Sequence, residues 1–255
     1  MQEVLPRFIE WLQSFPPEVI WPLIMLWCFG SLVALHRLFG QAGVYVYIIT
    51  AILAANIQVL KAVKFSVYPE PVALGTVVFS STYLATDILT ECYGPQAARR
   101  GVMMGFVCYL FFTGVMIFTL GYRPLSPAEA GTEMAWALPY HDHIAALFLP
   151  SPGFFIAGMV AYLVSQFNDV LIFQRVKRAT HGRFLWLRTN VSTAASALID
   201  NTVFSVLAWM VLNPKPVPWK TVVVVYIFGT YWLRLVLSVL DTPFMYLARR
   251  WRPAH

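Results

Sequence analysis

The sequence predicts an all-α protein that crosses the membrane several times. Of its 255 residues, 59% are hydrophobic and only 12% are charged, whereas about 25% of residues are charged in an average soluble domain. The mean hydropathy is +0.65. Apolar runs of about 20 residues, the length that spans a bilayer, recur along the whole chain. Too little sequence remains between them for a separate soluble domain.

The apolar runs define the expected spans. Turn-forming residues separate several of them, including Gly40, YPEP at 68–71, YGP at 93–95 and NPKPVP at 213–218. Pro95 suits the first turn of a helix, so a tight hairpin is expected before the fourth span. The expected spans are residues 19–39, 42–63, 71–92, 98–120, 153–175, 190–212 and 219–246.

The amino-terminal span differs from the others. Residues 1–18 carry acids and no basic leader, and the apolar run that follows is too long for a signal peptide, so we expect a permanent span. It contains no interior acid or amide, only His36 and Arg37 at one end. We therefore expect an N-terminal segment with one extra helix over residues 1–41, followed by a six-helix domain over residues 42–255 that is the working unit.

Residues 121–152 form the one long connection. Its weakly amphipathic sequence predicts a short surface helix at the pore mouth. His141, Asp142 and His143 are consecutive, and a helix cannot turn all three toward one ion, so we expect no metal site. Cys28, Cys92 and Cys108 have no paired spacing and are expected to be reduced. No cofactor is expected, and no nucleotide-binding G-x-x-x-x-G-K-[ST] sequence occurs.

The basic residues predict the orientation. Eleven Lys and Arg residues fall on the side of Arg37, Arg99, Arg175 to Arg188 and Arg249 to Arg252, against six on the opposite side. The side richer in Lys and Arg is normally cytoplasmic. This predicts an amino terminus outside and a carboxyl terminus inside. The net charge of +6 is then explained by the basic residues that set the orientation in the membrane, and a nucleic-acid partner is not expected.

Polar and ionisable residues within the spans are the candidate site. An ionised residue at the bilayer centre costs at least about 2.5 kcal/mol and usually faces protein or a water-filled cavity. Four spans each carry such residues at helical spacing on one face, so we expect them to converge on one cavity. These faces are Ser80, Tyr83, Asp87 and Glu91; Tyr162, Gln166, Asp169 and Phe173; Asn190, Thr193, Asp200 and Phe204, with Asn201 beside them; and Tyr231, Arg234, Ser238 and Asp241.

Structural explanations stand beside the functional one for several of these residues. Glu91 is close enough in sequence to form an ion pair with Arg99 and Arg100, and Arg234 is a natural lock for Asp169 or Asp200. Asn56, Gln166 and Asn190 have the chemistry of hydrogen-bonding contacts between helices. Taken together, the five acids against one arginine suit a cation or a ligand rich in hydrogen-bond donors. Phe79, Phe173 and the stripe tyrosines add flat surfaces for a planar ring.

Four blocks of the sequence carry a resemblance to a known family. The blocks FSSTYLATDILTECYGPQAARR, YLVSQFNDVLIFQRVKR, LWLRTNVSTAASALIDNTVFSVLAW and LRLVLSVLDTPFMYLARRW begin at Phe79, Tyr162, Leu185 and Leu233. In this order they resemble the queuosine precursor transporter family, also described as the vitamin uptake transporter family. The resemblance implies an inner-membrane importer of 7-cyano-7-deazaguanine, 7-aminomethyl-7-deazaguanine or queuine. It also implies a six-helix core similar to the substrate-binding subunits of energy-coupling-factor transporters.

The resemblance assigns the polar positions Asp87, Glu91, Gln166, Asp169, Asn190, Asp200 and Asp241 to the family's pattern. Arg234 stands where lysine is common in the family, and the extra first helix is a further departure. A deazaguanine offers N1–H and an exocyclic amine to one carboxylate, so we expect Asp169 or Asp200 to bind the purine edge. Asn190 or Gln166 would donate to O6, and Arg234 with Asp241 would form a movable pair at the inner gate.

Three functions remain open from the sequence. The first is a secondary or facilitated importer without covalent chemistry, with coupling to protons through Asp87 or Asp241 as one option. The second is a substrate-binding subunit that needs a separate energising module. The third, an intramembrane hydrolase with paired aspartates, is disfavoured because the acids lie on four spans without a nucleophile motif. We expect no enzyme activity. The partners expected are a 7-deazapurine and the lipid bilayer, and a homo-oligomer is left open.

Overall fold

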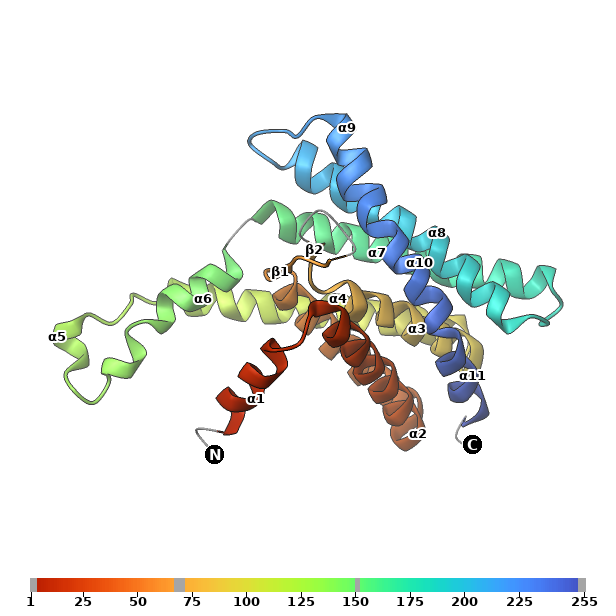
Figure 1. Ribbon diagram of the computed structural model, residues 1–255, viewed down its shortest axis with the longest axis horizontal. Helices are drawn as coiled ribbons and strands as arrows, with labels where there is room; N and C mark the ends of the chain where they lie inside the picture. The colour runs from red at the N-terminus through yellow and green to blue at the C-terminus, as the bar shows by residue number, and fades with distance from the viewer. Residues whose placement is uncertain (1–3, 67–71, 150–151, 252–255) are drawn as a thin grey trace.

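The computed structural model describes residues 4–66, 72–149 and 152–251 (Figure 1). It confirms an all-α polytopic membrane protein, because five helical stretches are long and apolar enough to cross a membrane. The YPEP turn at 68–71 and Arg252 lie outside the described residues. In chain order the elements are α1 (Val4–Gln13), α2 (Pro17–Gln58), β1 (Ala62–Val63), β2 (Val72–Ala73), α3 (Thr76–Cys92), α4 (Pro95–Gly121), α5 (Pro127–Ala130), η1 (Ala135–Ala137), α6 (Tyr140–Phe148), α7 (Pro152–Ala179), α8 (Leu185–Val206), η2 (Leu207–Val211), α9 (Trp219–Thr221), η3 (Val222–Phe228), α10 (Gly229–Leu240) and α11 (Thr242–Arg250).

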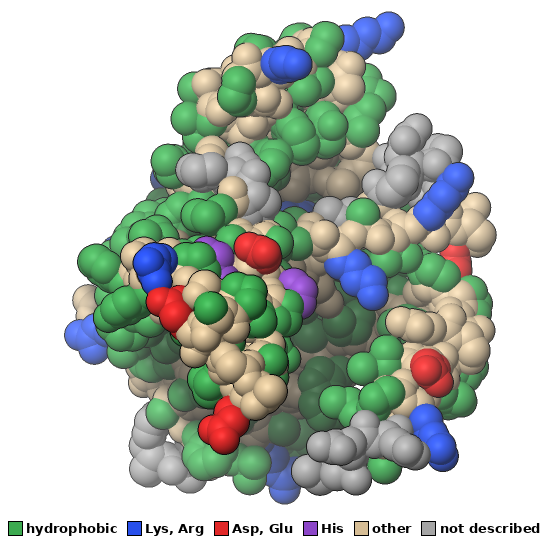
Figure 2. Space-filling view, turned by 90° about the vertical axis from the view of Figure 1, so that its left-hand side faces the viewer, with side chains coloured by type: hydrophobic (Ala, Val, Ile, Leu, Met, Phe, Trp, Pro, Cys, Tyr) green, Lys and Arg blue, Asp and Glu red, His purple; other side chains and the backbone are tan. Residues whose placement is uncertain are grey.

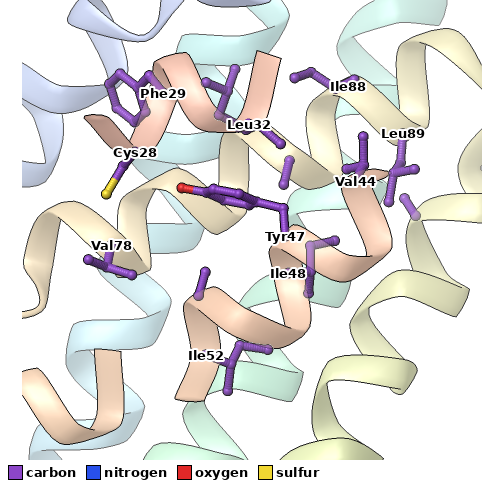
Figure 3. Close-up of a cluster of buried hydrophobic side chains, with 14 of the residues drawn as sticks. Cys28, Phe29, Leu32, Val44, Tyr47, Ile48, Ile52, Val78, Ile88 and Leu89 are labelled. Carbon is purple, nitrogen blue, oxygen red and sulfur yellow. The ribbon is translucent and has the colours of Figure 1, made fainter. Parts of the chain in front are cut away.

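Helix α2 is a hairpin that contains the first two predicted spans. The chain reverses at Gly40, whose φ of 59° and ψ of −135° are readily adopted only by glycine. The two arms pack side by side, and Figure 3 shows Tyr47 of the second arm pointing toward Cys28 of the first. Phe29 and Leu32 of the first arm are fully buried. The first arm of α2, which is the extra helix expected near the amino terminus, is therefore part of the packed core in this structure.

Gly43 allows the two arms of this hairpin to pack closely, and its replacement tests that packing. A Cβ atom added there would lie 2.1 Å from the backbone oxygen of Leu35. Backbone cannot move away as a side chain can, so Gly43→Ala is expected to lower the free energy of unfolding by about 1–3 kcal/mol or more. Thermal unfolding of the purified protein measures this. Gly114→Ala is the matched control, because nothing lies within 4 Å of an added Cβ there; equal stability of the two variants would contradict the close packing.

The boundaries predicted for the second and third spans were wrong. The second helix ends at Gln58 and the third begins at Thr76. Between them, β1 and β2 pair antiparallel with Ala62 opposite Ala73 and Val63 opposite Val72. Apolar composition does not distinguish helix from extended chain, and this short ladder satisfies backbone groups that would otherwise lack partners. As a result α3 has only 17 residues, slightly fewer than the roughly 20 of a typical span.

Helix α3 lies at the centre of the molecule. It contacts α2, α4, α7, α10 and α11. Nearly all of its side chains from Val77 onward are buried, including the polar ones. Helices α7 and α8 pack along each other beside it. A helix surrounded by protein in this way can carry carboxyl and hydroxyl groups at membrane depth, because none of them faces lipid.

The periphery of the molecule is apolar. Figure 2 shows hydrophobic side chains spread over the face that it presents, and large exposed residues include Phe111 and Phe118 of α4. The surface helix expected in residues 121–152 is α6, which packs on α4 through Phe112 and Phe148, with ring centroids 5.5 Å apart. Helix α1 was not predicted; its side chains are almost all exposed, and it extends away from the bundle (Figure 1).

The helix ends that the charge pattern assigns to one side do meet at one end of the bundle. The Arg37 guanidinium lies over the Trp251 ring at 4.5 Å, and Tyr93 and His36 are within hydrogen-bond distance at 3.2 Å. Alternate connections of the chain therefore return to the same end, as an up-and-down arrangement of spans requires.

Candidate functional site

A polar network joins the centre of α3 to α7. The amide of Gln166 donates to Thr82 Oγ1 at 2.7 Å. Thr86 Oγ1 lies 3.1 Å from Gln166 Oε1 and 3.3 Å from Asp169 Oδ2, so its single hydroxyl proton can be donated to either of these two acceptors. Gln166 and Asp169 are buried and one helical turn apart, which places both on the face of α7 that meets α3.

Three carboxyl groups gather beside this network. Asp87 of α3 faces Asp169 of α7, and Asp241 at the start of α11 lies within electrostatic range of both. All three are essentially inaccessible to solvent, with exposed fractions of 0%, 0% and 1%. Both oxygens of Asp87 and Oδ1 of Asp169 have no hydrogen-bond partner among the described residues. Two hydroxyls of α8 lie close to these acids, Thr189 beside Asp87 and Ser192 beside Asp169.

Helix α8 contributes a row of buried hydroxyls on the same side. Thr189, Ser192, Thr193 and Ser196 repeat at helical spacing and are at most 1% exposed. Except for Ser192, which donates to the Thr189 carbonyl oxygen at 3.2 Å, their hydroxyl oxygens have no partner within the described part of the chain, and the same holds for Ser80 on α3. An unsatisfied buried polar group costs about 1–3 kcal/mol. These hydroxyls, together with the carboxyl groups of Asp87 and Asp169, form one region of buried polar atoms with unused hydrogen-bonding capacity.

A charge-compensated pair lies next to the acids. Arg234 Nη1 donates to Asp200 Oδ2 at 2.6 Å, and Ser165 Oγ donates to Asp200 Oδ1 at 3.1 Å. Tyr83 lies beside the same pair. Of the two arrangements expected for Arg234, the lock on Asp200 is therefore present. The expected pairing of Arg234 with Asp241 is wrong, because the two residues are two helical turns apart and Arg234 reaches α8 instead.

Glu91 belongs to an ion cluster at one end of the bundle. Its carboxylate contacts Arg188 at 2.7 Å, Lys177 at 2.8 Å and Arg249 at 3.7 Å. Arg188 is fully buried, donates to the carbonyl oxygens of Gly182 and Arg183, and lies 5.5 Å from the centre of the Phe173 ring. The cluster ties α3, α7, α8 and α11 together.

The expected pairing of Glu91 with Arg99 and Arg100 is therefore wrong. Both arginines are exposed on α4, whereas the Glu91 side chain turns inward toward the other helices. Phe173, expected to offer a flat surface to a ligand, instead covers the Arg188 guanidinium.

The remaining predicted residues make contacts within their own helix or with neighbouring helices. Asn190 donates to the Trp186 carbonyl oxygen and to Thr242 Oγ1, both at 2.8 Å. Asn201 donates to the Ile227 carbonyl oxygen at 3.0 Å, within a π-helical segment whose carbonyl is available to an outside donor. Among the described residues, the Asn56 side chain donates a hydrogen bond to the Ile52 carbonyl oxygen of its own helix. Tyr231 donates to the Ala194 carbonyl oxygen. Phe79 packs against the apolar core. These contacts have the character of packing.

Sequence reasoning missed the hydroxyl residues that organise the site. Thr82 and Thr86 hold Gln166 and Asp169, and Ser165 holds Asp200. The signal was present in the spacing, because Thr82, Thr86 and Thr90 repeat every four residues along α3, as do the hydroxyls of α8. Small hydroxyl residues are common at contacts between membrane helices, so they did not stand out from composition.

Comparison with known proteins agrees with a membrane transporter. A family model described as "Putative vitamin uptake transporter" matches residues 73–248. The "Probable queuosine precursor transporter" of Bacillus subtilis (strain 168) is 30% identical over 219 residues, which is 86% of this chain and 88% of that protein. No solved structure matches the chain, so the likeness to energy-coupling-factor subunits stays a prediction. The match covers α3 through most of α11, the elements that bring the buried carboxyl groups together.

Proposed function

This chain belongs to the vitamin uptake transporter family, and we propose that as a member it imports 7-deazaguanine precursors of queuosine across the bacterial inner membrane. The observation that carries the proposal is the pairing of Gln166 and Asp169 on one face of α7, fixed by Thr86 and surrounded by unsatisfied polar atoms. The Bacillus subtilis relative is named as a transporter of such a precursor, which supports the same substrate class here.

The chemistry of this pair fits the edge of a guanine-like base. A carboxylate accepts N1–H and the exocyclic amine together as a bidentate pair, and Asp169 has one oxygen without a partner. A primary amide carries two N–H donors. Gln166 uses one on Thr82 and would turn the other to O6, one helical turn from the carboxylate. The row of α8 hydroxyls would bind the remaining polar atoms of the ring.

The neighbouring groups extend the proposed site. The Tyr83 and Tyr162 rings, both buried near the network, supply planar surfaces for the heterocycle. Asp241 would be the partner of the ammonium group of the aminomethyl precursor, because no cation among the described residues forms an ion pair with it. The Asp200–Arg234 ion pair would hold α8 and α10 in place at one side of the site. The nitrile precursor has no ammonium group, so it would leave Asp241 without a charged partner.

Transport by this site needs no covalent step. We propose that the amino terminus is outside and the carboxyl terminus is cytoplasmic, which places the Glu91 ion cluster at the inner end of the site. That cluster joins four helices and would close the path to the cytoplasm in the structure described, so its rearrangement would accompany release of the substrate inside.

Rescue of tRNA modification tests the proposed function. In a strain that cannot make 7-deazaguanine and lacks its own importer, this chain is expected to restore queuosine in transfer RNA when a precursor is supplied at submicromolar concentration. Queuosine is measured by mass spectrometry of digested transfer RNA. Equal queuosine with and without the chain, for each precursor supplied singly, would contradict the proposal. Rescue that appears only when an energising module is co-expressed would support the binding-subunit alternative.

A further inference from the structure

Asp87 has no role in the binding scheme above, although it is buried at the centre of the molecule. Its carboxyl group faces that of Asp169, and neither Asp87 oxygen has a hydrogen-bond partner in the described residues. Two ionised carboxylates in contact repel each other, and burial makes each charge more costly. A single shared proton removes the repulsion and gives both groups a hydrogen bond, as in other buried carboxyl pairs.

The geometry points to a proton-coupling site in which Asp87 carries one proton inward with each substrate molecule bound at Asp169. This inference rests on the proposed function, because Asp169 must be ionised to accept N1–H and the exocyclic amine. The proton of the pair then resides on Asp87. It enters from the outer solution with the substrate, both leave to the cytoplasm, and the pair returns outward without the proton. The repulsion between the two ionised groups then favours capture of the next proton from the outer solution, so each cycle moves one proton with one substrate.

Thr189 supports this assignment independently. Its hydroxyl is 0% exposed, has no other hydrogen-bond partner in the described chain, and belongs to the α8 side chain that interacts with Asp87. A hydroxyl can donate to an ionised carboxylate and accept from a protonated one. Thr189 thus suits a carboxyl group that alternates between the two states, which a purely apolar neighbour does not.

The surroundings favour a proton over a metal cation. In the described part of the chain, no three His, Cys, Asp or Glu side chains lie close enough together to hold one metal ion. The pair therefore lacks the cluster of three or more carboxylate, imidazole or thiolate ligands typical of a tight metal site, and the sodium replacement described below tests for a weaker cation site.

The other ionisable groups around the pair are already engaged or lie apart from it. On α8, Asp200 is bound by Arg234 of α10, and Arg188 is bound by Glu91. Helix α11 contributes Asp241, which is within electrostatic range and adds to the negative charge. Ionisable groups elsewhere on the packed elements include His36 and Tyr47 of α2, Tyr83 of α3, Arg99, Arg100 and Tyr109 of α4, Tyr162 and Lys177 of α7, Tyr231 of α10 and Arg249 of α11. None of these is among the groups that interact with Asp87, which are Asp169, Asp241 and Thr189. Asp87 therefore has no cationic partner that would hold it permanently ionised.

Proteoliposomes containing the full chain test the coupling. The probe is 7-cyano-7-deazaguanine, whose neutral substituent carries no proton of its own, and a pH dye trapped in the lumen reports proton entry. With the membrane potential clamped at zero, an inward substrate gradient is expected to acidify the lumen. One pH unit, acidic outside, is expected to drive accumulation of about tenfold, the equivalent of one proton per substrate. Replacing sodium by choline is expected to change neither result.

The outcomes separate this inference from the proposed function. Exchange of labelled for unlabelled probe without lumen acidification, and without a response to the pH gradient, would overturn the coupling and leave the importer in place. Loss of accumulation in choline would overturn it in favour of sodium. Absence of exchange and of binding for every precursor would overturn the proposed function and this inference with it.

Variants at Asp87 test the assignment to that residue. Asp87→Asn mimics a permanently neutral group, so it is expected to retain measurable exchange but to lose the response to the pH gradient. Asp87→Glu restores a titratable group and is expected to restore the response. Asp142→Asn is the matched control, because it removes an exposed acid of α6. A wild-type response in Asp87→Asn, or none in Asp87→Glu when that variant exchanges normally, would refute the role of Asp87.

Discussion

Asp169→Asn is expected to lower import at limiting substrate by at least about 100-fold. The variant loses two hydrogen bonds from the purine edge to a charged acceptor, each contributing about 1.5–3 kcal/mol, and about 1.4 kcal/mol corresponds to a factor of ten. Its new amide N–H group would also face the N–H donors of the base. Initial uptake rates of labelled precursor in whole cells measure the effect, with the amount of inserted protein quantified in the same membranes.

Two comparisons separate recognition from folding in this experiment. Asp142→Asn removes the same charge from an exposed position and is expected to transport at the wild-type rate. Gln166→Glu keeps the size of the side chain but removes the N–H donor to O6, so it is also expected to impair import. Near-normal uptake by Asp169→Asn in correctly inserted protein would show that Asp169 has a structural role and does not bind the substrate.

Glu91→Ala is expected to produce the largest loss of stability, about 3–5 kcal/mol in the free energy of unfolding. The substitution leaves the guanidinium of Arg188 buried, with an exposed fraction of 0%, and without its carboxylate partner. Removing one member of a buried ion pair typically destabilises a protein by this amount, because the remaining charge is uncompensated. Denaturant titration of the purified protein in mixed micelles, followed by intrinsic tryptophan fluorescence, measures the change.

A double variant shows whether the uncompensated charge is the cause. Glu91→Leu combined with Arg188→Leu removes both charges, and buried pairs replaced by apolar residues often retain stability, so it is expected to be more stable than Glu91→Ala. Arg123→Ala, which breaks an exposed pair with side chains 79% and 45% accessible, is expected to have no measurable effect. A Glu91→Ala protein as stable as wild type would show that the cluster does not hold the helices together.

Several features of the site were predictable because each helix face can be read from its own spacing. The sequence placed Asp87, Gln166, Asp169 and Asp241 on inward faces, and the structure brings them to one region. The assignment of pairs was less successful. Arg234 had Asp169, Asp200 and Asp241 as partners of comparable plausibility, and only the relative rotation of α8 and α10 decides that Asp200 is within reach at 2.6 Å.

The boundaries and the supporting residues were harder to predict. Residues 59–63, apolar except for Lys61, and residues 72–75 continue the composition of the adjacent spans, yet the chain there includes a two-stranded ladder. The hydroxyls of Thr82, Thr86 and Thr189 look like ordinary packing residues until the helices that face them are known. The burial of Arg188, which a basic loop sequence did not suggest, follows from the packing of the α7–α8 connection against Glu91.

By itself the sequence determined that this protein is an all-α membrane protein and which helix faces are polar. Both follow from local quantities, namely the apolar length needed to cross a bilayer and the helical repeat that places side chains on one face. Only the tertiary structure decided that Asp87 meets Asp169, that Arg234 binds Asp200 and that Glu91 closes one end of the bundle. These contacts join residues far apart in the chain, and the packing and rotation of whole helices set them, which no local spacing records.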